Sequence, residues 1–214
     1  MRRIVVSQRI VENESYQERR DALSHDWSRF VEQLLPEAAL LPLPNLLPDV
    51  EDWLRAVDGD ALLLSNGNDW GEAPERDETE SRAFRHFREA GSPVLGVCRG
   101  MQAINRLHGG TIAPDIGDHV ARDHAVELAV GPFSEIAGGT SLEVNSFHNQ
   151  GVRSDGIGKS LIPFASAAGG IVEGLHHETE PILGIQWHPE RDNPATRFDL
   201  DLLRTFFSDG AFWR

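Results

Sequence analysis

The sequence predicts an α/β protein with a mainly parallel central sheet flanked by helices and extended by antiparallel strands. In the first half, short apolar runs alternate with amphipathic segments, as in strands joined by helical crossovers. In the second half, the apolar runs are separated by Gly-rich turns, which favours antiparallel strands. The 214 residues, 40% of them hydrophobic, are expected to fold as a single domain over residues 1–214.

Four apolar segments of the first half are predicted to form the parallel strands. They are short, rich in Val, Leu and Ile, and separated by segments long enough for a helical crossover. The predicted strands are Arg3–Ser7, Leu40–Pro44, Asp60–Ser65 and Pro93–Val97.

The segments between these strands carry helix signals. Apolar residues at three- and four-residue steps predict a first amphipathic helix that contains Ala22, Leu23, Trp27, Phe30, Val31 and Leu34. Pro in the first turn and early acidic residues predict a second helix over Pro48–Val57. Two more helices are predicted over Thr79–Ala90, closed by Gly91, and over Gly100–Leu107.

The second half is expected to contain short strands and one closing helix. The amphipathic segment Phe198–Phe207 predicts that helix. In the first half, the acidic and polar stretch Asp69–Glu80 is predicted to be an exposed loop. The predicted strands are Ala125–Val130, Ser141–Val152, Ser160–Ala167, Gly170–Gly174 and Pro181–Trp187.

The only cysteine of the chain lies in Gly96-Val97-Cys98-Arg99-Gly100, between a predicted strand and a predicted helix. A strand that ends on Gly-x-nucleophile-x-Gly and turns into a helix holds the nucleophile on a tight bend, which small neighbours allow to form. A buried cysteine by itself is more often a small core residue than a nucleophile. The surrounding motif favours the nucleophile here.

A second motif, His188-Pro189-Glu190, ends another predicted strand. A cysteine nucleophile needs a base that takes its proton and a third group that orients the base. Cys98, His188 and Glu190 supply all three. Ligands of parallel sheets bind beyond the carboxyl ends of the strands. Because Ser65, Cys98 and His188 each lie at such an end, we expect them to meet at one edge of the sheet.

A carbonyl attacked by Cys98 becomes an oxyanion, which needs hydrogen-bond donors. After a nucleophile elbow, one donor is the backbone N–H of the next residue, and the second comes from a neighbouring loop. The predicted donors are therefore the backbone N–H of Arg99 and an N–H of the loop at Gly67 or Asn68.

Four motifs, taken in order, resemble the class I glutamine amidotransferase-like superfamily, and in particular its peptidase C26 branch, the γ-glutamyl hydrolases. They are Val94–Gln102, Gly109-Gly110-Thr111, Val144–Gln150 and Gly184–Glu190. The resemblance implies a flavodoxin-like fold, a Cys-His-Glu triad and cleavage of a γ-glutamyl amide through a thioester, and no cofactor is expected. In the family the oxyanion loop commonly carries two adjacent glycines, whereas in this chain it is Ser65-Asn66-Gly67-Asn68-Asp69.

The same resemblance implies contacts with the glutamyl group. Gln102 lies one helical turn beyond Cys98 and matches a position that helps to hold this group. Asn145, Ser146, Phe147 and His148 match a stretch that contacts its α-amino and α-carboxylate groups. From the residues alone, Gln102 can also be a helix-surface residue and His148 a structural histidine.

The segment Ser7-Gln8-Arg9, together with Asn13–Tyr16, resembles the γ-glutamyl-CDP-amidate hydrolases of surface-polysaccharide phosphoramidate pathways. This second resemblance implies that Arg9, which follows the first strand on the ligand side, lies near a phosphate of the leaving group. Arg9, Arg99, Arg122 and Arg153 show no pairing pattern in the sequence, so the alternative for each is the solvated surface.

Composition restricts the partners. The formal net charge of −14, from 34 acidic and 20 basic side chains, disfavours nucleic acid and anionic membranes. No apolar run approaches the ~18 residues that span a membrane, and the N-terminus does not resemble a signal peptide. A single cysteine permits no internal disulfide, so a cytoplasmic location is expected. The sequence leaves open whether the protein forms a homo-oligomer.

Two clusters of histidines and carboxylates are candidates for a metal site: His176-His177-Glu178, and His119 with Asp123-His124. Adjacent histidines in a strand point to opposite faces of the sheet. Neither cluster has the helical spacing of a zinc hydrolase. No metal site is predicted.

The leading hypothesis is a free-standing cysteine hydrolase that acts on a small-molecule γ-glutamyl conjugate and releases glutamate and an amine or amidate. One alternative is a glutaminase subunit that delivers ammonia to a separate synthetase. Another is a catalytically inactive binding module on the same fold. The intact set Cys98, His188 and Glu190 argues against the inactive module.

Overall fold

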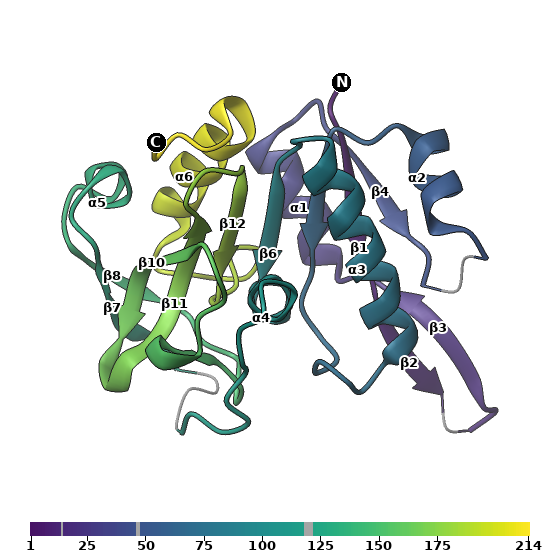
Figure 1. The fold of residues 1–214 in the computed structure, drawn as a ribbon, viewed down its shortest axis with the longest axis horizontal. Coiled ribbons are helices and arrows are strands. Elements are labelled where there is room, and N and C mark those ends of the chain that lie inside the picture. The colour runs from purple at the N-terminus through teal and green to yellow at the C-terminus, as the bar shows by residue number, and fades with distance from the viewer. Residues whose placement is uncertain (14, 46–47, 118–121) are drawn as a thin grey trace.

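A mixed ten-stranded sheet runs through the centre of the protein (Figure 1). The computed structural model describes residues 1–13, 15–45, 48–117 and 122–214. Within them the strand order is β4-β1-β5-β6-β12-β11-β10-β7-β8, with β9 paired to β11. The predicted fold class, a mostly parallel sheet with an antiparallel extension, is confirmed.

The parallel half of the sheet carries the strand ends on which the predicted site depends. Its five strands are β4 (Ala39–Leu43), β1 (Arg3–Ser7), β5 (Ala61–Leu64), β6 (Val94–Val97) and β12 (Ile182–Ile185). The four inner strands are almost fully buried, which suits their runs of Val, Leu and Ile, whereas the edge strand β4 is partly exposed. All five carboxyl ends therefore meet at one edge, the lower edge in Figure 1.

The antiparallel half begins at β12, which pairs with β6 in parallel and with β11 in the opposite sense. The segment Pro181–Trp187, predicted as part of the antiparallel extension, thus joins both halves of the sheet. The remaining strands are β11 (Ile171–His177), β10 (Leu161–Ala167), β7 (His124–Leu128), β8 (Ser141–Val144) and β9 (Val152–Arg153).

Helices cover both faces of the parallel half. On one face α1 (His25–Leu34) and α6 (Thr196–Asp209) pack in one apolar core. On the other face, which is in front in Figure 1, a second core holds α2 (Val50–Val57), α3 (Pro74–Glu89) and α4 (Arg99–Leu107). The other helical segments of the described residues are a short helix, α5 (Pro132–Ala137), and two 3₁₀ turns, Ser154–Gly156 and Ala168–Gly170.

The region before α1 differs from the prediction. A hairpin, β2 (Arg9–Asn13) and β3 (Glu18–Ala22), follows β1 directly, so the predicted helix starts only at His25. Among the strands of the described ranges, these two pair only with each other, and they are mostly exposed. Because they carry charged residues on both faces, they lack the alternation of apolar and polar residues that marks a strand. Ser24 caps the N-terminus of α1 through its hydroxyl group.

The stretch Asp69–Glu80, predicted as an exposed loop, is a loop only in its first part. Helix α3 begins at Pro74, and the side chains of Arg76 and Glu80 are fully buried. These two charged residues occupy core-facing positions of the helix, which interrupts the apolar periodicity used for the prediction. No helix in the described part of the chain has both the length and the apolar character needed to cross a membrane.

Candidate active site

Cys98 lies on a sharp bend between β6 and α4. Its backbone angles, φ 54° and ψ −107°, are unusual for a residue with a side chain. The bend brings the first turn of α4 against the neighbouring strand: a Cβ atom on Gly100 would lie 2.0 Å from the Leu64 carbonyl oxygen, and one on Gly96 2.5 Å from the backbone of Gly100. The structure therefore has the strand–elbow–helix geometry predicted from the two glycines.

His188 and Glu190 lie beyond the end of β12, the strand next to β6. His188 Nδ1 is 2.8 Å from Glu190 Oε1, so Nε2 is the nitrogen left for Cys98. Burial lowers the pKa of His188, but its interactions with Cys98 and Glu190 outweigh burial and raise that pKa to about 9. The imidazolium form of His188 is therefore favoured at neutral pH.

Asn66 is a site residue that sequence analysis did not identify. Its Nδ2 donates to Glu190 Oε1 at 2.5 Å and lies 2.9 Å from His188 Nδ1. Because Glu190 accepts the Nδ1 proton, the Asn66 amide also donates to Glu190 and not to the imidazole. The only signal for Asn66 in the sequence is its place directly after the strand end at Ser65.

The predicted oxyanion loop lies beside Cys98. Gly67 has a φ of 82°, which favours glycine, and lines the pocket with Asn66. Asn68 instead turns its amide to the hairpin, where it accepts from the N–H of Ile10 at 2.8 Å and donates to the Ile10 carbonyl at 3.0 Å. Gly67 lines the pocket and Asn68 does not, and the choice between their backbone N–H groups as the second donor stays a prediction.

These residues surround a pocket of about 260 Å³. The volume suits a small ligand. Four of the residues predicted to bind substrate line it, namely Arg9, Gln102, Phe147 and His148, and so do Cys98, Arg99 and His188. The other lining residues are Asn66, Gly67, Asp69, Asn149, Gln150 and Arg191.

Gln102 and His148 are held in the pocket wall by backbone contacts. Gln102 Nε2 donates to the carbonyl of Gln150 at 3.0 Å, and its side chain is buried. Nδ1 of His148 lies 3.0 Å from the same carbonyl, and its Nε2 lies 3.7 Å from Glu173. Phe147 is 41% exposed and meets the ring of His188 edge-on.

Among the described residues, Asn145, Ser146 and Asn68 do not line this pocket. Asn145 is 2% exposed and uses both ends of its amide on the backbone. It accepts from the N–H of His188 at 2.8 Å and donates to the carbonyls of His188 and Asp192 at 2.9 Å. Asn145 therefore holds the segment that carries His188 and Glu190, a structural task that its sequence position did not reveal.

The charged residues around the pocket partly differ from expectation. Arg122 and Arg153 are exposed, but the side chain of Arg99, for which the solvated surface was an alternative, is 3% exposed and paired with Asp77 and Glu80. Arg9 is exposed and lies against Gly67. Arg191, which sequence analysis did not select, stacks over the ring of Phe147 at 4.5 Å.

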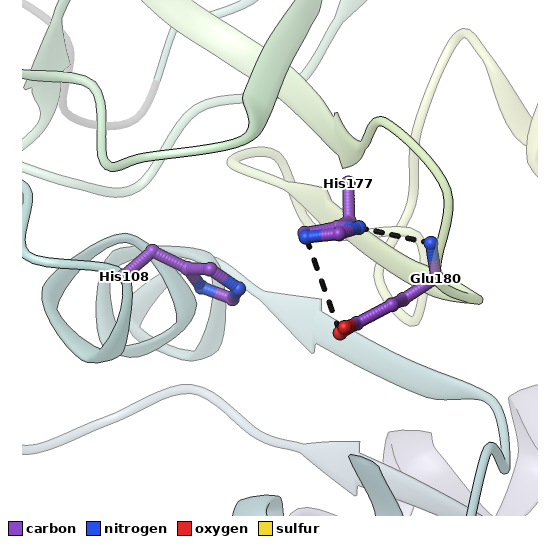
Figure 2. A group of neighbouring side chains, drawn as sticks. All are labelled: His108, His177 and Glu180. Carbon is purple, nitrogen blue, oxygen red and sulfur yellow. Dashed lines mark hydrogen bonds and ion pairs between the residues drawn. The ribbon is translucent and has the colours of Figure 1, made fainter.

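A separate cluster of possible metal ligands consists of His108, His177 and Glu180 (Figure 2), none of which lines the pocket. Nδ1 of His177 accepts from the N–H groups of Thr179 and Glu180, at 3.2 and 2.9 Å. In the neutral ring Nε2 then carries the proton and has no lone pair for a metal. Burial lowers the pKa of His177, which favours this neutral form.

The carboxylate of this cluster already has a cation. Glu180 accepts two hydrogen bonds from Arg88, at 2.6 and 3.0 Å. The donor set therefore does not suit a metal ion. As predicted, His176 and His177 point to opposite sides, His176 toward Trp213 and His177 toward His108. His119 of the other candidate cluster lies outside the described residues.

Comparison with known proteins places this geometry in a family. The model of the peptidase C26 family matches residues 4–190, which include every residue of the pocket except Arg191. The chain belongs to the peptidase C26 family. This membership supports a hydrolase with a glutamine amidotransferase-like fold.

Two curated relatives show the range of activities among proteins that are similar in sequence to this chain. The γ-glutamyl-CDP-amidate hydrolase of Campylobacter jejuni is 30% identical over 96% of this chain and 97% of its own length. A glutamine-hydrolysing GMP synthase component of Methanosarcina acetivorans is 31% identical over 77% of this chain and 80% of its own. Among solved structures, a glutamine amidotransferase of Thermotoga maritima superposes with a TM-score of 0.64 at 14% identity, covering 95% of this chain and 82% of its own. The structural likeness confirms the fold.

Proposed function

We propose that this member of the peptidase C26 family is a cysteine hydrolase that cleaves γ-glutamyl amides through a thioester on Cys98. The observation that carries the proposal is the placement of Cys98 and the His188–Glu190 pair at the ends of the neighbouring strands β6 and β12, around one pocket. A nucleophile, a base and a group that orients the base are thereby within reach of one bound carbonyl.

The reaction would proceed in two halves. The Cys98 thiolate attacks the γ-carbonyl carbon, and the resulting oxyanion accepts hydrogen bonds from the N–H groups of Arg99 and Gly67. His188, as imidazolium, gives its proton to the leaving nitrogen, so that the C–N bond breaks and the thioester remains. Neutral His188 then takes a proton from water, which attacks the thioester and releases glutamate. Glu190 holds the imidazole orientation throughout.

The pocket wall offers partners for the glutamyl group. Asp69 is the one carboxylate among the described lining residues, and we propose that it pairs with the α-ammonium group. Burial raises the pKa of Asp69, and the negative charge of the neighbouring Glu72 raises it further. A bound cation would favour the ionised carboxylate and so oppose both effects. Gln102, Phe147 and His148 form the wall around the rest of the group.

The rim of the pocket suits an anionic leaving group. Arg9 and Arg191 both line it, and the relative from Campylobacter jejuni acts, by its name, on a γ-glutamyl-CDP-amidate. Phosphate oxygens accept hydrogen bonds from guanidinium groups in a charge-assisted geometry. We therefore propose a phosphate-bearing amidate, such as γ-glutamyl-CDP-amidate, as the conjugate that this chain hydrolyses.

The test is a substrate panel with detection of released glutamate. It contains a γ-glutamyl nucleotide amidate, γ-glutamyl p-nitroanilide and free glutamine. We expect hydrolysis of the first two, and complete loss of both activities in Cys98→Ser, with the unfolding midpoint preserved. Cys98→Ser that retains activity, or a wild-type chain inactive on the whole panel, would remove the proposal. The second result would favour the inactive binding module.

A glutaminase subunit is the second candidate, because the GMP synthase relative from Methanosarcina acetivorans matches three quarters of the chain. Free glutamine in the panel separates the two. A glutaminase subunit would hydrolyse glutamine, and more strongly once its synthetase partner is present. Turnover of the nucleotide amidate at least tenfold above that of glutamine would exclude this candidate.

A further inference from the structure

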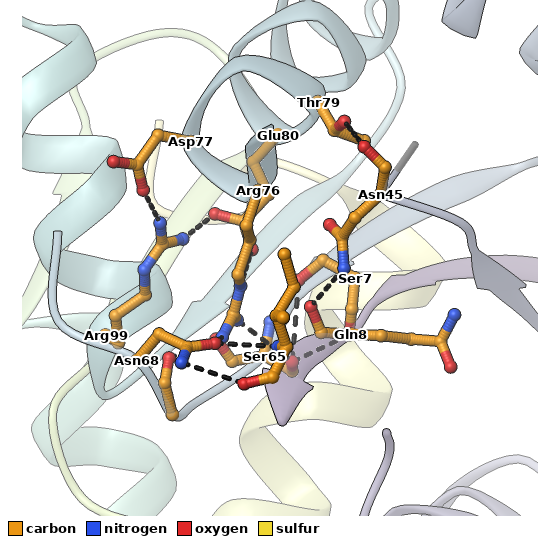
Figure 3. A network of polar contacts seen from close by, with 12 residues as sticks. Ser7, Gln8, Asn45, Ser65, Asn68, Arg76, Asp77, Thr79, Glu80 and Arg99 are labelled. Atoms are coloured by element: carbon orange, nitrogen blue, oxygen red, sulfur yellow. Dashed lines mark hydrogen bonds and ion pairs between the residues drawn. The ribbon is translucent and has the colours of Figure 1, made fainter. Parts of the chain in front are cut away.

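Behind the pocket lies a cluster of buried charges that the proposed mechanism does not use (Figure 3). Arg76 and Glu80 of α3 have fully buried side chains, and that of Arg99 of α4 is 3% exposed. Buried charges are costly unless they are paired and hydrogen-bonded. Their partners therefore indicate what the cluster does.

The guanidinium group of Arg76 binds the backbone on both sides of the oxyanion loop. Its Nη2 donates to the carbonyl of Ser65 at 2.8 Å, and its Nη1 donates to the carbonyl of Gly67. Figure 3 shows this side chain reaching from α3 to the loop between Ser65 and Asn68. One planar group thus fixes two carbonyls two residues apart.

These bonds determine the direction of the loop N–H groups. In a trans peptide the N–H points away from the C=O of the same unit. When Arg76 draws the carbonyls of Ser65 and Gly67 toward α3, the two outer peptide units are fixed in orientation. The unit between them, which carries the N–H of Gly67, is held between two fixed neighbours.

The other proposed donor of the oxyanion hole, the backbone N–H of Arg99, is connected to the same cluster. The N–H of Arg99 follows Cys98 directly, and the side chain of this residue runs back to Asp77 and Glu80 on α3. Glu80 also accepts from Nε of Arg76 at 2.8 Å. Glu80 is therefore shared by the side chain that holds the loop and by the side chain of the residue after the nucleophile.

We propose that Arg76 is a positioning residue: the bridge Arg76–Glu80–Arg99 fixes the separation between the two backbone donors of the oxyanion hole. The role of the hole rests on the proposed function, whereas the effect of Arg76 on the loop does not. Burial lowers the pKa of Arg76 to about 10 and that of Arg99 to about 9, so both remain cations at neutral pH.

Arg76→Lys tests the bridge. A lysine offers one point charge and lacks the planar fork that reaches both carbonyls, so the loop loses one of its two anchors. Misplacement of a catalytic group by about 1 Å costs on the order of 10²-fold in rate. We expect kcat on the γ-glutamyl substrate to fall by about that factor with KM unchanged, because the hole acts on the transition state.

Two measurements separate positioning from a general structural loss. The rate and pH profile of Cys98 alkylation by iodoacetamide should remain at wild-type values, because alkylation forms no oxyanion. Hydrogen exchange of the backbone amides at residues 66–68 should become faster in Arg76→Lys, while exchange in α6 stays unchanged. Arg82→Lys is the matched control, since this arginine of the same helix pairs with Glu51 away from the pocket.

The outcomes distinguish the two proposals. Wild-type kcat or wild-type loop exchange in Arg76→Lys would overturn the positioning role. Faster loop exchange combined with a wild-type chain that hydrolyses no γ-glutamyl amide would retain the bridge and refute the proposed function. If Arg76→Lys does not fold, Glu80→Gln weakens the link to Arg99 while keeping an oxygen for Arg76. It should lower kcat by about tenfold at constant KM, and a wild-type kcat would again overturn the bridge.

Discussion

Oxygen Oε1 of Glu190 accepts from two donors, Nδ1 of His188 and Nδ2 of Asn66. The second bond fixes the carboxylate from the side of β5, so the imidazole is oriented from two strands of the sheet. The His-x-Glu spacing alone predicted the first contact. It could not predict Asn66, because a contact between residues 124 positions apart depends on which strands are neighbours.

The raised pKa of His188 predicts an alkaline limb in the pH profile. The imidazolium that protonates the leaving nitrogen loses its proton as pH rises through its pKa. Turnover should therefore fall near pH 9, whereas with an ordinary histidine it would fall near pH 6.5. Glu190→Gln removes one interaction that raises this pKa and should shift the limb to lower pH. Measurement of kcat/KM from pH 6 to 10 checks both, with Glu178→Gln, an exposed carboxylate, as control. A limb that stays in place in Glu190→Gln would assign the orienting role to another group.

Arg9 predicts selectivity for the leaving group. Arg9→Ala should weaken kcat/KM for a γ-glutamyl nucleotide amidate by about tenfold and leave γ-glutamyl p-nitroanilide nearly unchanged, because only the phosphate accepts from the guanidinium group. The factor is modest because Arg9 is exposed and water screens its charge. Arg20→Ala in the same hairpin is the control, since Arg20 pairs with Glu18 and lies outside the pocket lining. Equal losses on both substrates would make Arg9 a structural residue.

At the scale of elements, the sequence predicted those segments whose apolar residues face a core. The five parallel strands, α1, α4 and α6 all have such a face, and each was predicted as a strand or helix to within a few residues, although β12 was assigned to the antiparallel extension. The hairpin β2–β3 was missed because its strands cover no core. The start of α3 was missed because Arg76 and Glu80 occupy buried positions where apolar residues are expected. Burial of a charged residue can be predicted only when its partners in the folded structure are known.

The elbow between β6 and α4 makes a prediction about packing. Gly100→Ala would place a Cβ 2.0 Å from the backbone carbonyl oxygen of Leu64, which a side-chain movement cannot relieve. We expect the free energy of unfolding to fall by about 1–3 kcal/mol, which is typical of overpacking. Activity should also be lost, because β5 leads into the oxyanion loop. Gly139→Ala is the matched control, since no described residue beyond its chain neighbours has an atom within 4 Å of that Cβ. Thermal unfolding and kcat are measured for both variants. Equal stability of the two would contradict the close approach of Gly100 to the Leu64 carbonyl.

At the scale of the whole molecule, the end of the chain supports the site. Asp199 of α6 accepts from Nε1 of Trp187 at 2.8 Å and from Nδ2 of Asn193 at 2.5 Å. Asn193 in turn accepts from the backbone N–H of Asn145, which holds His188. Residues 145, 187–193 and 199 thus form one connected polar unit between α6 and the pocket. The sequence did not reveal this unit, because its members lie in three separate segments of the chain.

The buried carboxyl group of this unit predicts how stability depends on pH. Burial raises the pKa of Asp199 to about 7, with a further contribution from Glu190, against the hydrogen bonds of Trp187 and Asn193. Since the folded protein binds this proton more tightly than the unfolded chain, whose pKa is near 3.8, the contribution of Asp199 to stability is largest below that value. It falls as pH rises toward 7, by about 4 kcal/mol at most.

Asp199→Asn should remove this dependence. The variant loses a hydrogen-bond acceptor at every pH, so the slope of its stability against pH, and not its level, is the test. Urea unfolding between pH 4 and pH 8 should show the free-energy difference between variant and wild type moving in favour of the variant by a few kcal/mol. Asp201→Asn is the control, because this half-exposed carboxylate lies on the same helix. Parallel curves for Asp199→Asn and wild type would mean that Asp199 is ionised in the folded protein throughout, with its charge held by Trp187 and Asn193.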